Sequence, residues 1–461
     1  MSGLNESDSQ KFTHGPRAPT PAYPFDTTED ILILARKYRS EGQPQEVSFR
    51  SLVSWLKIGE RATHYIHPYP AKLLPQIAHF FLASNLLAGD DDVVLDPFGG
   101  TGTVALESNL SGRNAFFADA NPLARLIAAV KTNDYDLEAV TASAECLSDA
   151  YYRSRKTKPP SIVNVDIWYD ERICRQLSRL HWSIADFPKT PVKDLFWVTF
   201  SCIARKLSNA DPRLSVPVRL KESKWTSGTI PNVWDTFFVQ LQANIQRIIE
   251  AKRLMSSQKT SSQCVGKDAR RLMTTSSWDG DTQSQLESDS VGLVITSPPY
   301  AGAQKYIRAS SLSLGWLGLA GSHQLKGLEN ENIGREHLPK AIYDNLQTTG
   351  IDAADDVLKL IHKKNPLRAA IAGVYINEMR AAIKEMARVL KPGGFVILVI
   401  GNNLICGQPF QSSEYMAHLL AEAGLRPIMK LVDEIKSRGL MTKRNKTAGI
   451  ISREWVLVYQ K

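Results

Sequence analysis

A short segment in the second half of the chain joins a strand to a stiff, aromatic turn. Residues 294–300 read VITSPPY, so an apolar run leads directly into two prolines and a tyrosine. Because proline fixes its own φ and lacks an N–H, we expect Ser297–Tyr300 to form a rigid turn at the strand end. Such a turn presents a hydroxyl, a carbonyl and an aromatic face together, which suits stacking on a planar base while acceptors hold its amino group. For this segment alone, a strand terminator with a core tyrosine explains the pattern equally well.

A glycine-rich turn lies far upstream, between a short apolar strand at 93–95 and an apolar helical stretch at 104–110. The turn consists of Asp96, Pro97, Phe98, Gly99, Gly100, Thr101, Gly102 and Thr103. Glycines let a ligand approach the backbone closely, and the following helix N-terminus offers free N–H groups. The spacing matches neither the dinucleotide G-x-G-x-x-G fingerprint nor a P-loop.

An acidic residue follows the next predicted strand, at 115–118. Asp119 lies roughly 20 residues beyond the glycine turn, where a doubly wound sheet places a carboxylate on ribose hydroxyls. The alternative is a capping role before Asn121-Pro122. With the glycine turn upstream, we favour the ribose contact.

These segments together resemble the amino-methylating DNA methyltransferases that use S-adenosylmethionine. Asp96–Thr103 is similar to the cofactor loop of that family, D-P-F-x-G-x-G-T, and Ile295–Tyr300 matches its catalytic signature in the form associated with the N4 amino group of cytosine. His67–Lys72 resembles the segment beside the methionine moiety. Residues 266–270 (GKDAR) resemble the strand end whose acid contacts the adenine amino group.

The resemblance covers roughly residues 60–136 and 262–461, in one of the permuted arrangements known in the family. It implies an α/β, Rossmann-like class I methyltransferase sheet that is mostly parallel, with one antiparallel C-terminal strand and a helical insertion. The implied cofactor is S-adenosyl-L-methionine. Its implied contacts are Asp96, Pro97, Phe98, Gly99, Gly100, Thr101, Gly102, Asp119, Asp268 and Lys72, and the implied catalytic residues are Ser297, Pro298, Pro299 and Tyr300.

The chemistry of amino methylation explains these residue types. The amino nitrogen of cytosine is a poor nucleophile because its lone pair is delocalised into the ring. We expect the Ser297 hydroxyl and the Pro298 carbonyl to accept hydrogen bonds from the two amino protons, and Tyr300 to stack on the base. Catalysis would then rest on positioning and fixed dipoles. The base must be flipped out of the duplex. A carbon-5 cytosine mechanism is disfavoured because the chain contains no Pro-Cys pair.

Other target classes stay open at this point. Adenine-N6 enzymes of the family usually carry Asp or Asn where this chain has Ser297, which favours cytosine-N4 by association. An RNA amino-methyltransferase would use the same chemistry. A catalytically silent nucleic-acid-binding protein is disfavoured because both motifs are intact.

Composition agrees with a nucleic-acid substrate. The chain has 461 residues, a formal net charge of +9 and a pI of about 9.1, and an excess of positive charge favours a polyanionic partner such as double-stranded DNA. Its five cysteines are scattered, which suits a reducing cytosol, and no metal site is expected, so we interpret His64 and His67 as packing residues. The sequence shows neither a signal peptide nor a membrane span.

The sequence predicts four regions. Residues 1–28 form a polar, proline-rich flexible tail, and 29–136 form the cofactor-binding half, which begins with helices over 29–62. Residues 137–261 form a helical insertion that is a candidate for target recognition. Residues 262–461 form the catalytic half, with a variable, substrate-facing stretch at 301–366.

Within the catalytic half, apolar residues spaced by three and four predict an amphipathic helix from Ile376 to Leu390. We expect Lys391–Gly394 to terminate it before a buried strand at 395–400, and a C-terminal hairpin to close the sheet. Four basic residues flank the expected cleft and are candidates for phosphate contacts: Lys305, Arg308, Lys443 and Arg444. A cognate restriction endonuclease is a possible partner by analogy with the family.

Overall fold

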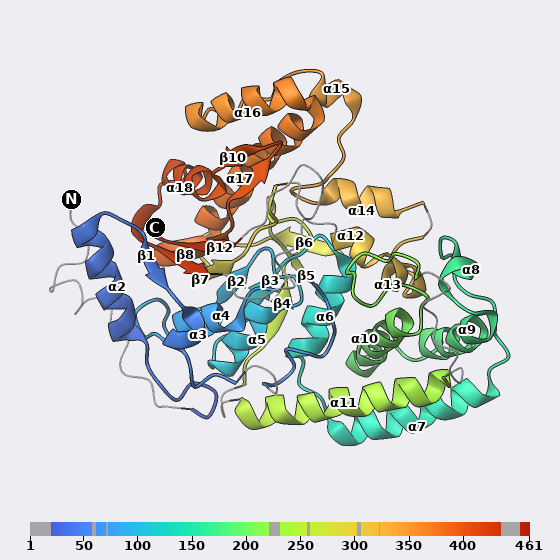
Figure 1. The fold of residues 1–461 in the computed structure, drawn as a ribbon. Helices are drawn as coiled ribbons and strands as arrows, with labels where there is room; N and C mark the ends of the chain where they lie inside the picture. The colour runs from blue at the N-terminus through green and yellow to red at the C-terminus, as the bar shows by residue number, and fades with distance from the viewer. Residues whose placement is uncertain are drawn as a thin grey trace.

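A mostly parallel sheet forms the centre of the molecule (Figure 1). The computed structural model describes residues 20–57, 61–70, 72–220, 231–255, 259–301, 306–321, 323–434 and 452–461. Within these residues, eight strands pair in the order β1-β11-β12-β8-β7-β2-β3-β4. They are β1 (Gln45–Val47), β2 (Val94–Asp96), β3 (Ala115–Phe117), β4 (Ser262–Cys264), β7 (Val291–Thr296), β8 (Leu390–Ile400), β11 (Arg426–Glu434) and β12 (Arg453–Gln460).

Strand β12 runs antiparallel to both of its neighbours, β11 and β8, whereas the other pairs in this sheet are parallel. This confirms the expected α/β fold with one antiparallel strand near the C-terminus. The predicted C-terminal hairpin is the pair of β11 and β12.

Helices cover both faces of the sheet. One face packs against helices α2 (Thr28–Glu41), α3 (Phe49–Leu52), α4 (Pro75–Leu82) and α5 (Thr103–Leu110), and the other packs against α17 (Pro366–Val389) and α18 (Ser412–Glu422). Strand β7 serves both faces because side chains alternate along a strand. Leu293 and Ile295 belong to the first core, and Val294 belongs to the second.

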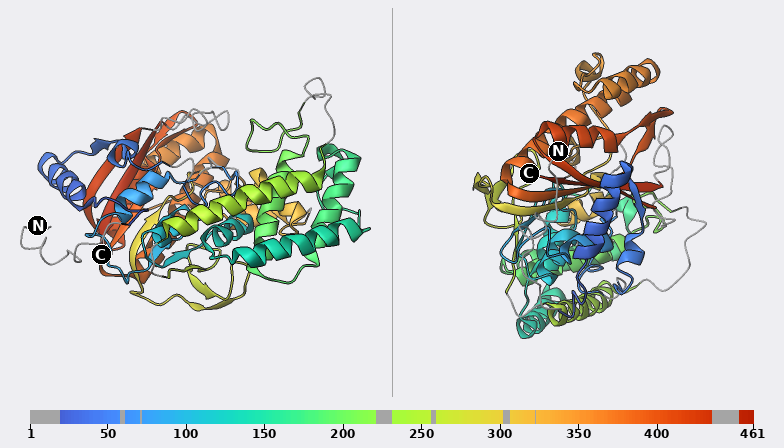
Figure 2. Two further views of the ribbon diagram at one scale, coloured as in Figure 1. Left: turned by 90° about the horizontal axis from the view of Figure 1, so that it is seen from below. Right: turned by 90° about the vertical axis from the view of Figure 1, so that its left-hand side faces the viewer.

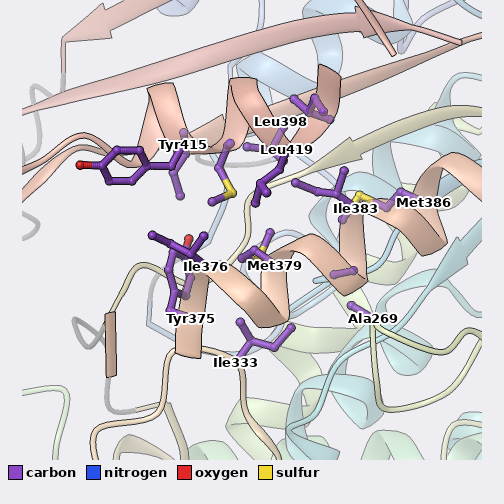
Figure 3. Close-up of a cluster of buried hydrophobic side chains, with 14 of the residues drawn as sticks. Ala269, Ile333, Tyr375, Ile376, Met379, Ile383, Met386, Leu398, Tyr415 and Leu419 are labelled. Carbon is purple, nitrogen blue, oxygen red and sulfur yellow. The ribbon is translucent and has the colours of Figure 1, made fainter. Parts of the chain in front are cut away.

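Helix α17 carries the predicted amphipathic face. Ile376, Met379, Ile383 and Met386 are fully buried beneath the sheet and point into one cluster (Figure 3). The helix begins earlier than the periodicity suggested, at Pro366. Helix α17 ends at Val389, which confirms the expected termination, but Lys391–Gly394 is not a separate turn: strand β8 begins at Leu390, and its pairing with β7 shifts register between Leu390 and Phe395.

The segment between β3 and β4 is a helical layer beside the sheet (Figures 1 and 2). It contains α6 (Pro122–Thr132), α7 (Leu137–Arg153), α8 (Val165–Trp168), α9 (Glu171–Ala185), α10 (Pro191–Lys206) and α11 (Val233–Leu254). Tyr151 of α7 stacks on Trp234 of α11 with ring centroids 5.2 Å apart. The chain re-enters the sheet where the Ser261 amide donates to Asn114 Oδ1 at 2.9 Å and the Ser262 hydroxyl donates to Asn109 Oδ1 at 2.7 Å.

The N-terminal region differs from its prediction in two ways. Residues 20–27 are not a loose tail, because Tyr23 is buried and its hydroxyl donates to Glu107 Oε2 at 2.8 Å. The region also contains a strand as well as helices, since β1 extends the sheet beside β11. A three-residue edge strand is too short to give a clear alternating pattern in the sequence.

Smaller elements complete the described chain. These are β5 (Met273–Thr275), β6 (Thr282–Gln285), β9 (Asn403–Ile405), β10 (Gln408–Phe410), α12 (Tyr306–Ala309), α13 (Ser311–Trp316), α14 (Leu325–Glu331), α15 (Lys340–Tyr343) and α16 (Asp352–Lys364). Among the described helices, none combines the length and the apolar character that a membrane span requires.

Candidate functional site

The two sequence motifs meet where the strand order of the sheet reverses. From β2 the chain proceeds outward through β3 and β4, and it then returns to the other side of β2 as β7. In open α/β sheets, ligands bind at such a switch point, outside the carboxyl ends of the strands. Here those ends are Asp96 on β2 and Thr296, followed by Ser297, on β7.

A cavity at this edge is lined by both motifs. The lining residues include Tyr69, Lys72, Asp96, Pro97, Phe98, Gly99, Gly100, Thr101, Thr103, Asp119, Lys267, Asp268, Ser297, Pro298, Pro299, Tyr300, Glu331, Ile333 and Glu454. All the predicted catalytic residues and all the predicted cofactor residues except Gly102 therefore border one space. Gly102, near the end of the turn, is the N-cap of α5.

Asp96 anchors the glycine turn to the catalytic strand. Its Oδ1 accepts hydrogen bonds from the Thr296 hydroxyl at 2.6 Å and from the Phe98 amide at 3.1 Å. Burial raises the pKa of this carboxyl to about 7, although both hydrogen bonds act in the opposite direction. Through these two bonds Asp96, which also lines the cavity, positions the start of the turn.

The glycine turn depends on backbone conformations and spacings that side chains would disrupt. Gly100 and Gly102 have φ values of +50° and +72°. A Cβ on Gly102 would lie 2.9 Å from Ala128 Cβ on α6, and a Cβ on Gly99 would lie 3.0 Å from Phe117 Cβ. The glycines thus let α6 and β3 pack directly behind the turn while its backbone borders the cavity.

Asp119 closes the opposite side of the turn. Its two carboxylate oxygens accept hydrogen bonds from the Gly100 amide at 2.9 Å and from the Asn121 amide at 2.8 Å. The N-cap of α6 is Asn121, whose side chain accepts from the Leu123 amide, so Asp119 supports the turn before the helix and does not cap it. The carboxylate also borders the cavity, where its remaining lone pairs are available to hydroxyl groups of a ligand.

Lys72 supplies a cation to the cavity wall. Its Nζ donates to the His67 carbonyl at 2.7 Å and to the His64 carbonyl at 3.2 Å. Burial lowers the pKa of Lys72 to about 8. Two carbonyl oxygens hold this ammonium group without neutralising it.

Asp268 borders the cavity beyond β4, as the motif suggested, but its carboxylate already has a partner. Arg270 contacts both of its oxygens, at 2.8 and 3.0 Å. Arg270 also donates to Glu378 of α17 at 2.7 Å, which ties this corner to the second core. A ligand amino group at Asp268 would share the carboxylate with Arg270.

The Ser297–Tyr300 turn after β7 matches the expectation except at Tyr300, which does not point outward. Ser297 is partly exposed at the cavity, and Pro298 is buried beside it. Tyr300 is only 7% exposed, and its hydroxyl lies 3.1 Å from Glu454 Oε1 on β12. The ring is therefore fixed in the cavity wall and does not project from the molecule.

The segment around α14 forms another wall of the cavity. Glu331 pairs with Lys267 at 3.2 Å, which joins this segment to the turn beyond β4. Gly334 packs behind the catalytic turn, since a Cβ there would meet the Tyr300 carbonyl at 3.1 Å. Arg308 on α12 is exposed and lines a smaller adjoining cavity with Pro299. The other three predicted phosphate contacts, Lys305, Lys443 and Arg444, lie outside the described residues.

Sequence reasoning missed the polar groups that act across long distances. Glu107 is fully buried on α5, where Arg61 Nε lies 3.0 Å from Oε1 and His64 Nε2 lies 2.7 Å from the same oxygen. The packing interpretation of His64 therefore omitted its acidic partner. Thr296 and Glu454 were also missed, because a threonine in a buried strand and a glutamate at an edge carry no distinctive local pattern.

No family model matches the chain. Among curated proteins, the Type II methyltransferase M.MvaI from Kocuria varians is 22% identical over 407 residues, which span 84% of this chain and 87% of that protein. The Type II methyltransferase M.MjaII from Methanocaldococcus jannaschii is 39% identical over 75 residues, which span 16% of this chain and 14% of that protein.

Among solved structures, a SAM-dependent methyltransferase from Methanosarcina mazei aligns with 85% of this chain and 99% of its own, with a TM-score of 0.29 and 11% identity. The rRNA methyltransferase aviRa from Streptomyces viridochromogenes aligns with 90% of this chain and 96% of its own, with a TM-score of 0.33 and 10% identity. In sequence, the chain is thus similar along most of its length to a Type II methyltransferase.

Proposed function

We propose that the protein is a site-specific DNA methyltransferase that transfers a methyl group from S-adenosyl-L-methionine to the N4 amino group of a flipped-out cytosine. The observation that carries the proposal is the shared cavity, in which the glycine turn after β2 faces the Ser-Pro-Pro-Tyr turn after β7. Similarity to a Type II methyltransferase over 84% of the chain supports the same reaction class.

The cavity suits the proposed cofactor at several points. The backbone of the glycine turn offers close approach at a helix N-terminus, and Asp119 offers acceptors for ribose hydroxyls. Lys72 provides a cation for the methionine carboxylate, and Asp268 provides an acceptor for the adenine amino group. When bound, this cofactor supplies a methyl group activated by its sulfonium.

The catalytic turn positions the target amino group. The Ser297 hydroxyl and the Pro298 carbonyl accept hydrogen bonds from its two N–H groups, which favours a pyramidal nitrogen whose lone pair is directed at the methyl group. Transfer would form the N–C bond and break the S–C bond to leave a neutral thioether, and the methylated nitrogen would then release one proton to solvent. Tyr300 stacks on the flipped base, and its hydroxyl contact with Glu454 restrains the ring. Because these groups are fixed before the substrate arrives, little reorganisation is needed at the moment of reaction.

The helical layer between β3 and β4 is the proposed reader of the DNA sequence. A second cavity of about 820 Å³ lies between this layer and the α12–α13 segment, and it shares Tyr69 with the first. Its lining includes Arg205, Lys206 and Arg213, which suits a phosphate backbone. Arg308 adjoins the catalytic turn and extends the basic surface toward the flipped base.

The decisive experiment is transfer of labelled methyl groups from S-adenosylmethionine to duplex DNA, with an RNA of the same sequence as the parallel substrate. The DNA is then digested to nucleosides, which are identified by mass. We expect N4-methylcytosine in DNA and no label in RNA. N6-methyladenine would replace the target assignment, and label in RNA alone would overturn the DNA assignment.

The proposed biological context is restriction–modification, in line with the Type II description of both curated relatives. The partner in that context is a restriction endonuclease that cuts the same DNA site when it is unmethylated. Resistance of methylated plasmid DNA to one of a panel of restriction enzymes would identify the site.

A further inference from the structure

Lys131 is a buried lysine to which the proposed mechanism assigns no role. It lies in the last turn of α6, and only 1% of its surface is exposed. Within the described part of the chain, no carboxylate forms an ion pair with it, and its Nζ has one hydrogen-bond partner, the Thr101 hydroxyl at 3.4 Å. A buried ammonium group without a counter-ion is costly, so its retention in the core calls for a physical reason.

The charged groups that face Lys131 do not neutralise it. Lys72 repels it from the cavity wall, and Glu107 on α5 attracts it but is already bound to Arg61 and His64. The rings of His64 and His67 are also near enough to interact with its charge. Burial, followed by repulsion from Lys72, lowers the pKa of Lys131 well below its ordinary value.

The polarity of the contact with Thr101 is fixed once Lys131 is protonated. A charged lysine is only a donor, so in that state the Thr101 oxygen accepts from Nζ and its own proton is directed elsewhere. Thr101 is part of the glycine turn and borders the cavity, as does Lys72. The hydroxyl proton of Thr101 is therefore available to an anion in the cavity, with two lysines behind and beside it.

We propose that Lys131 is a positioning residue that acts through Thr101 to make this end of the cavity a subsite for a carboxylate. The inference rests on the proposed function, under which the carboxylate belongs to the methionine part of S-adenosylmethionine. The bound anion supplies the counter-charge that the protein core lacks. Binding is accordingly coupled to uptake of a proton by the lysine pair.

The test compares two ligands that differ in the carboxylate alone: S-adenosylmethionine and its decarboxylated form. Their affinities are measured by isothermal titration calorimetry on the full chain, for wild type and Lys131→Met. Loss of the hydrogen bonds that link Lys131 through Thr101 to the carboxylate should weaken ligand binding by about tenfold or more. We expect that loss for S-adenosylmethionine and no change for the decarboxylated form.

A matched pair of variants at Thr101 checks the proposed route. Thr101→Val removes the hydroxyl at nearly constant shape and should reproduce the selective loss, whereas Thr101→Ser keeps the hydroxyl and should retain wild-type selectivity. Calorimetric titrations with S-adenosylmethionine in two buffers of different ionisation enthalpy give the number of protons taken up on binding. Lys131→Met should take up fewer protons than wild type, an effect that a purely structural role would not produce.

The results distinguish failure of the Lys131 role from failure of the proposed function. Equal weakening of both ligands in Lys131→Met, or no weakening of either, would overturn the role of Lys131 while leaving the proposed function standing. Failure of the wild-type protein to bind S-adenosylmethionine at all would overturn the proposed function and the subsite together. Folding of Lys131→Met is expected to be intact, because methionine replaces a buried charge with an apolar side chain of similar length.

Discussion

The Thr296 hydroxyl donates a hydrogen bond to Asp96 Oδ1 at 2.6 Å, and both residues are buried. The two belong to neighbouring parallel strands, β7 and β2, and are separated by 200 residues in the sequence. One is the last residue of its strand before Ser297, and the other begins the glycine turn. The bond thus sets the position of one motif relative to the other.

Replacing Thr296 with valine should disturb both motifs together. The substitution keeps the shape but leaves Asp96 without one of its two donors, at a cost of about 1–3 kcal/mol. We expect weaker cofactor binding, a lower methylation rate and a lower melting temperature. Thr296→Ser, which keeps the hydroxyl, is the control. A Thr296→Val enzyme with wild-type affinity and rate would show that the bond has no positioning role.

Ser297→Ala should separate catalysis from cofactor binding. Loss of one fixed acceptor for the target amino group is expected to slow methyl transfer by about 10²–10³-fold. Cofactor affinity, measured by equilibrium dialysis, should be unchanged because the hydroxyl contacts the base. A purified Ala variant that methylates DNA at the wild-type rate would remove Ser297 from the mechanism. Ser297→Thr retains a hydroxyl and should keep measurable activity.

Two glycines of the same turn should respond differently to alanine. Gly102→Ala adds strain at φ +72° and places a Cβ 2.9 Å from Ala128 Cβ, so α6 must move. Gly100→Ala, at φ +50°, meets no atom within 4 Å and adds backbone strain alone, of about 1–2 kcal/mol. Urea denaturation should show the larger loss of unfolding free energy for Gly102→Ala. Equal losses would mean that packing against α6 is not the constraint.

Three histidines buried in neutral form should contribute less to stability below pH 6.5, whereas Asp96, whose carboxyl pKa is raised to about 7, acts in the opposite direction. Burial lowers the pKa of His64 to about 4, of His67 to about 3 and of His181 to about 4. Between pH 6.5 and about 4 these histidines take up protons in the unfolded chain but not in the folded protein, so their contribution to the free energy of unfolding decreases as pH falls. Each fully responding histidine contributes about 1.4 kcal/mol per pH unit.

The matched variant for this prediction is His67→Gln. In the wild-type protein His67 Nε2 lies 2.9 Å from the Ser201 hydroxyl, and the glutamine amide can keep this contact. Unfolding free energies are measured in urea at pH 7, 6 and 5. The slope against pH should be shallower than in wild type by up to one proton. An unchanged slope would show that folding does not lower the pKa of His67.

Local sequence patterns were enough to predict the main elements near the site. The α17 face was visible because Ile376 and Met379 repeat with helical spacing, and the glycine turn was visible because strand, turn and helix are consecutive. The predicted strand at 294–296 and the start of the turn also match the structure. These are features whose physical cause lies within a few residues.

The unpredicted features depend on residues that meet only after folding. Nothing near Thr296 in the sequence indicates that its partner is Asp96, and nothing near His64 points to Glu107. The buried position of Tyr300 follows from its contact with Glu454, which comes from the last strand. Nothing near Lys131 in the sequence indicates its burial, because the packing of α6 behind the glycine turn sets it.

The re-entry point beside β3 has an evolutionary consequence. Asn109 and Asn114 hold Ser261 and Ser262 beside β3, so the return of the chain to the sheet is fastened independently of the helices that precede it. Helix α6 packs against Gly102 and carries Lys131, so a change there would disturb the glycine turn. Under the proposed function, new target specificities would instead arise in α7–α11 while the pairing of β2 with β7 is kept.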